Sequence, residues 1–393
     1  MSGLRGLLQI ANPRRLGEVR RSSGRIRSMS VIRPSLVTAF LVVSACGGGS
    51  DGDADRSPNS AAESVRSPTS TAVAEAESVA ETRAPVTADT TSSEPALPAV
   101  EPTASIPLGE HVDGGLVTDD AVWAVVTENE MLYRIDPHTN AVVQELAAPG
   151  IGYRFAIGHG AAWVSDFDAS VVRRVDLDSG AVVAEIATGM HPEGVSVNND
   201  AVWVANHHGG SVTRIDPNTN TAVATIEVGP AGEMGPQAIV ASDERVWVGV
   251  PNLGQVVVID AATNALVAKI KSPATCGEMS VLAESIWVTN CFETDDVAVI
   301  DQDGEEARGL KAGGPAGTSV LIDGEVWLAT ISLEDATGRF LRIDPATLEI
   351  LDSVVADPPS YSIGQGFGSI WQFSWDAGAV IRLPIDPFVN PAG

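Results

Sequence analysis

The stretch that decides the fold is VWVANHHGGSVTRIDPNTNTAVATIEVG, residues 202–229, because its pattern recurs along the chain. Tryptophans in the same apolar context stand at seven places: Trp123, Trp163, Trp203, Trp247, Trp287, Trp327 and Trp371. The intervals between them are 40, 40, 44, 40, 40 and 44 residues. Seven near-equal steps, each long enough for several short strands, are typical of a propeller. We therefore predict an all-β, seven-bladed β-propeller of four-stranded antiparallel blades.

The strands of one blade follow from the alternation of apolar residues and turns. In the third repeat we expect strands at 194–197, 201–205, 211–215 and 222–228. The last two are joined by Asp216–Asn220, DPNTN, where Pro and Asn suit the φ angles of a tight turn. Similar turns begin at Asp136, Asp260 and Asp344. The repeat therefore predicts regular hairpins as well as the number of blades.

The two ends of the repeat region are complementary. The seventh repeat stops at Asp386 without a fourth strand, whereas a surplus strand, TASIPLG of Thr103–Gly109, precedes the first repeat. Its spacing matches VATIEVG of Val223–Gly229. We predict that Thr103–Gly109 closes the ring as the outer strand of the last blade, which removes a free edge.

These segments resemble the YVTN-type repeat of bacterial surface and secreted β-propellers. The resemblance covers nearly all of residues 103–388 and implies the propeller fold. It leaves the function open, because one fold hosts many unrelated activities.

The N-terminal part predicts export and membrane anchoring. Residues 1–46 are Arg-rich and end in an apolar run, Leu36–Ala45, followed by Cys46. Such an order is typical of a secretory signal, and Val43–Cys46 resembles the lipobox of bacterial lipoproteins, which implies cleavage before Cys46 and its lipidation. A start at Met29 would leave a signal of ordinary length. We expect the chain on the outer face of the cytoplasmic membrane.

The remaining boundaries follow from composition. Residues 47–101 are rich in Ser, Thr, Ala, Pro and Glu without aromatic residues, and we predict a disordered tether. The propeller is expected over residues 102–388, with a tail at 389–393. Residues 102–393 hold 13 Lys and Arg against 40 Asp and Glu, a formal charge of −27. This charge repels phosphate backbones, so nucleic acid is not an expected partner. We expect a monomer.

In propellers, the loops from outer to inner strand and from second to third strand share one face around the central channel, where ligands usually bind. This rule comes with the fold resemblance and assigns polar residues to a ligand-binding rim. The rim candidates are His111, Tyr153, Arg154, Asn206, Gln237, Asn290, Tyr361 and Trp375. The ligand could be a small molecule, a cell-wall polymer or a protein.

A second set, His191, Glu193, His207 and Glu278, combines imidazoles with carboxylates. Such groups suit a general base or a divalent metal such as Mg²⁺ or Ca²⁺; the alternative is hydrogen-bonding surface histidines. Some propellers with similar repeats, the virginiamycin B lyase family among them, use top-face His and Glu with a metal to open a cyclic ester by elimination. That resemblance implies a metal-dependent lyase, or a related lactone hydrolase. The competing prediction is a binding or interaction module without catalysis.

Two cysteines are placed to pair. Cys276 precedes the inner strand of the fifth repeat and Cys291 follows its second strand. In an antiparallel hairpin these ends lie side by side, and an exported domain is oxidising enough to keep a disulfide. We predict a Cys276–Cys291 bridge, with two free buried thiols as the alternative.

Overall fold

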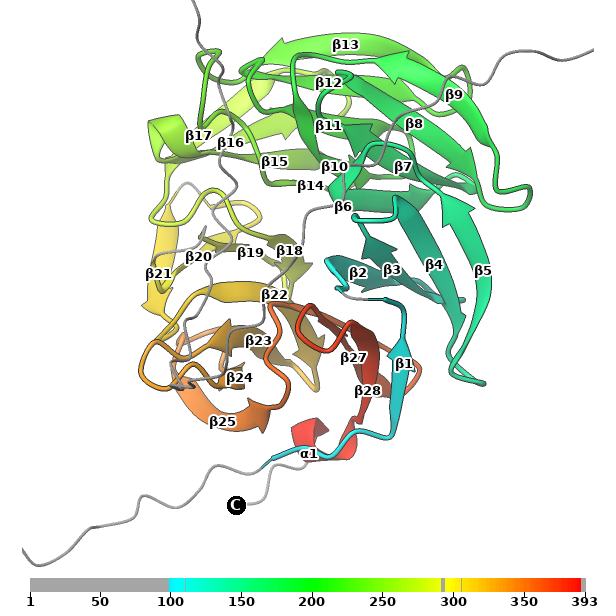
Figure 1. Cartoon of the computed structure of the whole chain (residues 1–393). Coiled ribbons are helices and arrows are strands. Elements are labelled where there is room, and N and C mark those ends of the chain that lie inside the picture. The colour runs from blue at the N-terminus through cyan, green and yellow to red at the C-terminus, as the bar shows by residue number, and fades with distance from the viewer. Residues whose placement is uncertain (1–98, 110, 291–293, 305, 390–393) are drawn as a thin grey trace, which may run out of the picture. The chain divides into compact units, whose positions relative to one another are not determined.

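The computed structural model describes residues 99–109, 111–290, 294–304 and 306–389. These residues form seven four-stranded antiparallel sheets arranged as the blades of one propeller, with the inner strands around the centre (Figure 1). The predicted fold class is confirmed. Among the described residues, no helix has the length and apolar character needed to span a bilayer.

The blades follow the chain order, each from inner to outer strand. Blade 1 contains β2 (Gly114–Val117), β3 (Val122–Val126), β4 (Met131–Asp136) and β5 (Ala141–Ala147). Blade 2 contains β6 (Ile151–Gly158), β7 (Ala161–Asp166), β8 (Val171–Asp176) and β9 (Val182–Ala187). Blade 3 contains β10 (Pro192–Val197), β11 (Val202–Asn206), β12 (Ser211–Asp216) and β13 (Thr221–Glu227). Blade 4 contains β14 (Ile239–Ala241), β15 (Arg245–Val250), β16 (Gln255–Asp260) and β17 (Leu266–Lys271), with the 3₁₀ turn η1 (Pro251–Leu253).

The last three blades complete the ring. Blade 5 contains β18 (Met279–Leu282), β19 (Ser285–Thr289), β20 (Asp296–Asp301) and β21 (Ala307–Lys311). Blade 6 contains β22 (Ala316–Ile322), β23 (Glu325–Ile331), β24 (Gly338–Ile343) and β25 (Ile350–Ala356). Blade 7 contains β26 (Ser362–Gly366), β27 (Ser369–Ser374), β28 (Ala379–Pro384) and, as its outer strand, β1 (Ala104–Pro107). A short helix, α1 (Asp386–Val389), follows β28.

The ring closes as the sequence predicts. β1 pairs antiparallel with β28, from Ala104 opposite Arg382 to Pro107 opposite Ala379. Ile106 of β1 is 6% exposed and packs with Val380 and Phe373. A segment from the start of the described chain therefore supplies the outer strand of the last blade and part of its core.

The core lies between the blades. The seven tryptophans of the repeat are each at most 1% exposed, and every one lies on the second strand of its blade. Trp203 of blade 3, for example, belongs to a buried cluster with Val246, Val248 and Val257 of blade 4. Seven such clusters occur among the described residues, one for each pair of neighbouring blades. The tryptophans are therefore structural, because each closes the seam to the next blade.

Arginines on the third strands fasten these seams. Arg174 lies over the ring of Trp163, and its Nη1 donates hydrogen bonds to the Pro217 carbonyl and to Oδ1 of Asn220 in the next blade. Asn220 has a φ of 55°, a left-handed conformation that Asn tolerates well. The same contact from Arg382 reaches Pro137 and Asn140 of blade 1. The turn between third and fourth strand thus has two roles. It joins the hairpin of its own blade, and it accepts hydrogen bonds from an arginine of the preceding blade.

Residues 1–98 and 390–393 lie outside the described residues. The signal segment, the lipidation of Cys46, the tether up to residue 98 and most of the tail therefore stay predictions.

Candidate functional site

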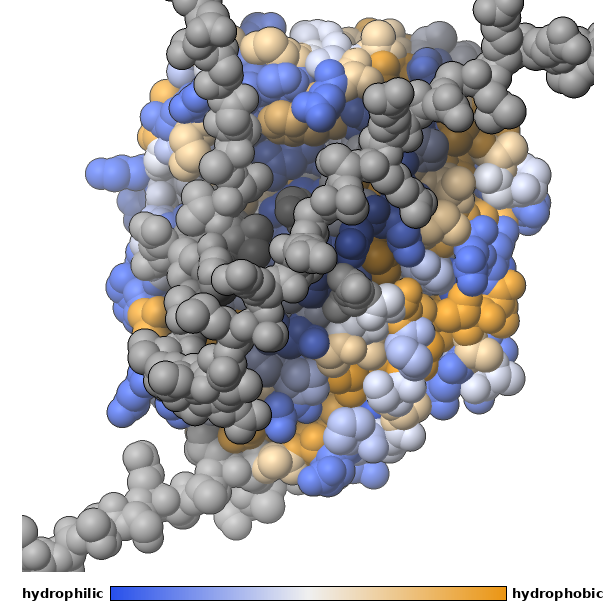
Figure 2. Space-filling model, in the orientation of Figure 1, coloured by the Kyte–Doolittle hydropathy of each residue, from blue (hydrophilic) through white to orange (hydrophobic). Residues whose placement is uncertain are grey.

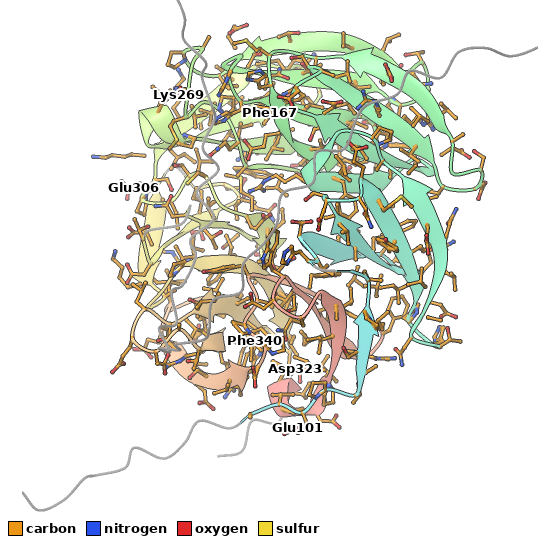
Figure 3. The ribbon with its side chains drawn as sticks, viewed as in Figure 1. Glu101, Phe167, Lys269, Glu306, Asp323 and Phe340 are labelled. Atoms are coloured by element: carbon orange, nitrogen blue, oxygen red, sulfur yellow. The ribbon has the colours of Figure 1, made fainter. Side chains whose placement is uncertain are left out.

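Three loops bring four aromatic rings together on the channel face of blades 2 and 3. Phe167 follows β7 directly, His191 precedes β10, and His207 and His208 follow β11. Ring centroids are 4.3 Å apart for Phe167 and His191, 4.4 Å for His191 and His208, and 4.8 Å for His207 and His208. Phe167 is labelled in the upper, green part of the ring in Figure 3. We call these four residues the histidine cluster.

The backbone holds His191 in an uncommon conformation. Its φ is 53°, in the left-handed region that costs a residue with a Cβ on the order of 1–3 kcal/mol. Backbone hydrogen bonds from His207 N to the His191 carbonyl, 2.9 Å, and from Gly209 N to the Met190 carbonyl, 3.1 Å, tie the two loops together. The Nδ1 atoms of His191 and His208 lie 2.5 Å apart, so one of the two rings donates to the other. The loops therefore present the rings in one fixed arrangement.

His207 is buried, with 8% of its surface exposed. Its ring makes a hydrogen bond to the backbone of Pro236, which has only a carbonyl to offer, so the ring is the donor there. Since Nδ1 has no hydrogen-bond partner among the described residues, we assign the proton to Nε2. Burial lowers the pKa of His207 below its usual 6.5, and the opposing pull of Glu193 is the smaller effect. The neutral ring consequently carries a free lone pair on Nδ1.

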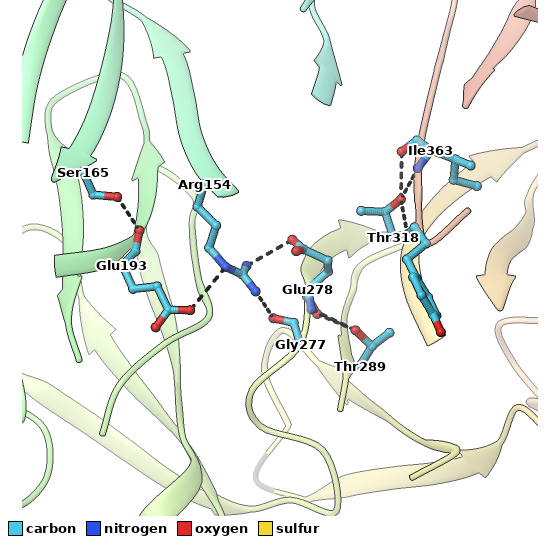
Figure 4. A network of polar contacts seen from close by, with 9 residues as sticks. Arg154, Ser165, Glu193, Gly277, Glu278, Thr289, Thr318 and Ile363 are labelled. Atoms are coloured by element: carbon cyan, nitrogen blue, oxygen red, sulfur yellow. Dashed lines mark hydrogen bonds and ion pairs between the residues drawn. The ribbon is translucent and has the colours of Figure 1, made fainter. Parts of the chain in front are cut away.

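Arg154 connects blade 2 to blades 3 and 5 through two carboxylates. From β6, its Nη1 lies 3.1 Å from Oε2 of Glu278, and its Nη2 donates to the Gly277 carbonyl at 3.0 Å. Its Nε lies 3.9 Å from Oε1 of Glu193 on β10. Figure 4 shows the guanidinium between the two acids, which come from opposite sides of it. Neither carboxylate is therefore an isolated charge.

The backbone around both acids is also anchored. Ser165 Oγ donates to the Glu193 carbonyl at 2.8 Å, and Glu278 N donates to Oγ1 of Thr289 at 2.8 Å. Gly194, next to Glu193, has no room for a side chain, because a Cβ would lie 2.2 Å from the Gln237 carbonyl. Strand β10 of blade 3 and the segment before β14 of blade 4 therefore approach each other closely next to Glu193.

The arrangement bears on the expected metal chemistry. The structure brings Glu193, Glu278 and His207 into one network, but Arg154 occupies the space between the two acids. In the part of the chain that the structure describes, no three His, Cys, Asp or Glu side chains are arranged to hold a metal ion. The contacts of the His191 ring are with Phe167 and His208, two other members of the histidine cluster. The four predicted catalytic residues are thus neighbours, but they do not form a ligand set.

Two further rim candidates meet at the seam between blades 7 and 1. The ring of His111 stacks on Trp375 with centroids 4.2 Å apart and an interplanar angle of 10°, and Trp375 remains 37% exposed. Tyr361, which directly precedes β26, is 40% exposed, and its pKa is raised by burial and by the nearby charge of Asp376. These aromatic side chains are available to a ligand.

Other rim candidates are placed differently from the expectation. Asn206 is fully buried: its amide donates to Ser211 and Thr213, and its Oδ1 accepts from Gly189 N. Asn290 donates to Thr294 at 2.8 Å, and its Oδ1 lies 3.1 Å from Sγ of Cys276. Both support loops from inside, because a short amide next to a strand end satisfies the backbone and hydroxyl groups of its own turn.

Three positions are only partly described. Gln237 is half-buried, and its backbone N donates to the Gly249 carbonyl. The side chain of Tyr153 lies outside what the structure describes. Cys276 is buried, whereas Cys291 is outside the described residues, so the disulfide stays a prediction.

Phe167 and His208 lie at the centre of the histidine cluster; the sequence assigns both to loops of the channel face, but neither was among the selected site residues. The signal for both was present: they occupy the loops between second and third strand in consecutive repeats, at Asp166-Phe167-Asp168 and Asn206-His207-His208. Asp166 in fact points inward, where it is 8% exposed and pairs with Arg173.

The opposite face carries a separate depression of about 510 Å³, formed by the hairpins between inner and second strands and lined by His159, Asn198 and Asp243 among others. It contains none of the candidates. On the side shown in Figure 2, hydrophilic residues surround the part of the centre that is visible, while apolar residues gather on the outer flank over β4 and β5, where Val143 is 56% exposed.

The fold defines the chain as a seven-bladed β-propeller, and comparison with solved structures gives similar chains. A streptogramin B lyase is 14% identical with a TM-score of 0.58, covering 71% of this chain and 96% of that one. The hydrazine synthase of Kuenenia stuttgartiensis is 15% identical with a TM-score of 0.57, covering 70% and 96%. A chain of a mitotic checkpoint complex is 10% identical with a TM-score of 0.60, covering 78% and 98%.

No family model and no curated protein matches the sequence. The likeness to the solved structures is therefore one of fold.

Proposed function

We propose that this chain is an exported, lipid-anchored propeller that binds a ligand on the channel face, at the histidine cluster and the adjoining rim. The observation that carries the proposal is the Arg154 bridge. Because Arg154 lies between Glu193 and Glu278 and offsets one of their two negative charges, we assign these acids to a structural brace of the channel mouth rather than to a metal site. The same face carries partly exposed rings from two blades, Phe167 of blade 2 and Tyr361 and Trp375 of blade 7, which suit contact with a ligand.

A test should compare the two faces of the same ring. Ligand-observed NMR of the full chain in detergent micelles, with a fragment library of anionic, uncharged and cationic compounds, identifies binders. The variant Phe167→Ala/Trp375→Ala should abolish the signal of such binders. The matched variant is His138→Ala/Phe367→Ala, which removes an edge contact between an imidazole and a phenyl ring on the opposite face. This variant should leave the signal unchanged. Compounds that bind both variants equally, or no binder at all, would overturn the proposal.

The second candidate is a metal-dependent lyase or lactone hydrolase. Two observations favour it: the fold likeness to a streptogramin B lyase, and the free Nδ1 lone pair of a neutral His207 beside Glu193. Thermal shift with Mg²⁺, Ca²⁺, Mn²⁺ and Zn²⁺ separates the candidates. A stabilisation by one ion that disappears in His191→Ala/His207→Ala but persists in His138→Ala/His159→Ala would favour the enzyme. The binding proposal expects the same small response from all three proteins.

The anchoring part of the proposal rests on the sequence Leu36–Cys46. Cells fed a labelled fatty acid should incorporate it into the wild-type chain and not into Cys46→Ala, which should leave the membrane fraction. A labelled Cys46→Ala chain would contradict lipidation at this residue.

A further inference from the structure

His207 and Glu193 present two hydrogen-bond acceptors to each other. Nδ1 of His207 lies 3.6 Å from Oε2 of Glu193, and since Nε2 carries the proton that is donated to Pro236, Nδ1 offers only a lone pair. Two facing acceptors repel each other unless a donor lies between them, and a buried acceptor without a donor costs about 1–3 kcal/mol. The pair therefore lacks one hydrogen-bond donor between Nδ1 of His207 and Oε2 of Glu193.

Among the described residues, neither Arg154 nor His208 supplies this donor. Arg154 approaches the other oxygen of Glu193, Oε1, and directs its two Nη groups to Glu278 and to the Gly277 carbonyl. His208 contacts His207 through its ring and shares its Nδ1 with His191. A donor from outside can reach the pair along the Glu193 side chain, which is 30% exposed.

The surroundings favour a donor that carries positive charge. Glu193 is a carboxylate, and Phe167 lies 6.3 Å from the His207 ring and stacks on His191, so an aromatic wall borders the acceptor pair. A cation gains from both a carboxylate and an aromatic ring. The propeller adds a long-range attraction, since residues 102–393 carry 13 basic against 40 acidic side chains.

We infer that the acceptor pair of Glu193 and His207 binds the ammonium group of an amine ligand, with the ligand's apolar part against Phe167. This inference rests on the proposed binding function and names its ligand class. One N–H of the ammonium donates to Nδ1 of His207 and a second to Oε2 of Glu193, which satisfies both acceptors. His207 stays neutral in the complex, because a protonated ring could not accept.

The test uses three probes of similar shape and different charge: 2-phenylethylammonium, 2-phenylethanol and phenylacetate. Isothermal titration of the full chain should show the ammonium binding about tenfold more tightly than the alcohol, with no binding of phenylacetate. Glu193→Gln should remove this preference. Glu227→Gln makes the same change at the exposed end of β13 in the same blade, and it should keep the preference.

A second readout does not depend on a variant that folds. In protein with ¹⁵N-labelled histidine, the ammonium probe should shift the Nδ1 resonance of His207 and leave that of His159 in place. A shift caused equally by the alcohol, or an unmoved His207 while the ammonium binds, would overturn the inference. Should uncharged fragments bind the Phe167 face while the ammonium does not, the amine inference fails and the binding function survives. If no compound binds there, both fail.

Discussion

Arg154 is central to the channel mouth, because its side chain pairs with acidic and carbonyl groups from two other blades. Its guanidinium reaches Glu278, the Gly277 carbonyl and Glu193 in three directions, which the planar fork of an arginine allows and a lysine does not. Removing it would leave two acids of like charge facing one opening. We therefore expect Arg154 to contribute to the stability of the folded propeller.

Arg154→Ala should lower the free energy of unfolding by about 1–2 kcal/mol, since Glu278 is partly exposed and solvent takes over some of the lost contact. Arg154→Lys should recover only part of this loss. Urea unfolding followed by tryptophan fluorescence measures both. Arg339→Ala, which breaks an exposed pair with Asp335, is the control and should cost less. Equal stability of Arg154→Ala and the wild type would show that the bridge is not structural.

His207 should give stability a pH dependence of known sign. Burial lowers its pKa in the folded state below 6.5, so between these two values the unfolded chain binds more protons. The contribution of His207 to the free energy of unfolding should therefore be fully present above pH 6.5. It should decrease as the pH falls from 6.5 to the lower pKa of the folded state. In turn residues such as Asp136 and Asp216, a backbone hydrogen bond lowers the pKa below 3.8, so their contribution is lost only at lower pH.

The measurement is the melting temperature between pH 7.5 and pH 5. His207→Gln should show a flatter dependence than the wild type, whereas His159→Gln, at the exposed hairpin before β7, should follow the wild type. An identical slope for all three proteins would mean that His207 does not titrate in this window.

At the scale of the strand, β1 is the element on which the ring depends. It lies far from β28 in sequence, yet it pairs with it along its whole length, and Thr103 and Leu108 extend the pairing with backbone hydrogen bonds to Arg382 and Gly378. Without β1 the third strand of blade 7 would be an open edge. Arg382 adds a clamp from β28 to the Pro137 turn of blade 1, so both contacts close the same seam.

Ile106→Ala should destabilise the propeller by about 2–5 kcal/mol, the usual cost of truncating a buried isoleucine, because its side chain fills the core of the closing blade. Ser105→Ala, at the neighbouring exposed position, should have almost no effect. Thermal unfolding by circular dichroism compares the two variants. A similar melting temperature for Ile106→Ala and Ser105→Ala would show that β1 is only loosely attached.

The strands and turns were predictable from the sequence because every blade repeats the same buried tryptophan and most repeat the same turn. Trp203 and its six equivalents mark second strands, and the Asp216–Asn220 turn marks a hairpin, so spacing alone located blades and closure. The site was predictable only as a set of loops. Neither the burial of Asn206 nor the position of Arg154 between Glu193 and Glu278 follows from spacing, because both depend on contacts between different blades or turns.

For the whole molecule the dominant property is its charge. The formal charge of −27 for residues 102–393 is spread over a surface with few cations to pair it, and residues 47–101 add three Arg and ten acids. Self-repulsion of this kind destabilises a compact state and at the same time keeps it soluble and away from anionic surfaces. A propeller that is tethered to a membrane with anionic lipids would consequently be held off that membrane by its own field.

The melting temperature of the full chain should therefore rise as NaCl is increased from about 0.01 M to about 0.15 M, because the screening length falls from roughly 30 Å to roughly 8 Å. MgCl₂ at the same ionic strength should raise the melting temperature by the same amount if the ions only screen the repulsion and none is bound at a specific site. The control is Glu145→Gln/Glu227→Gln, which removes two exposed acids from outer strands and should raise the melting temperature at low salt only. A melting temperature independent of NaCl would show that the repulsion is already compensated, and a further rise specific to Mg²⁺ would point to a bound cation and return weight to the metal-dependent lyase.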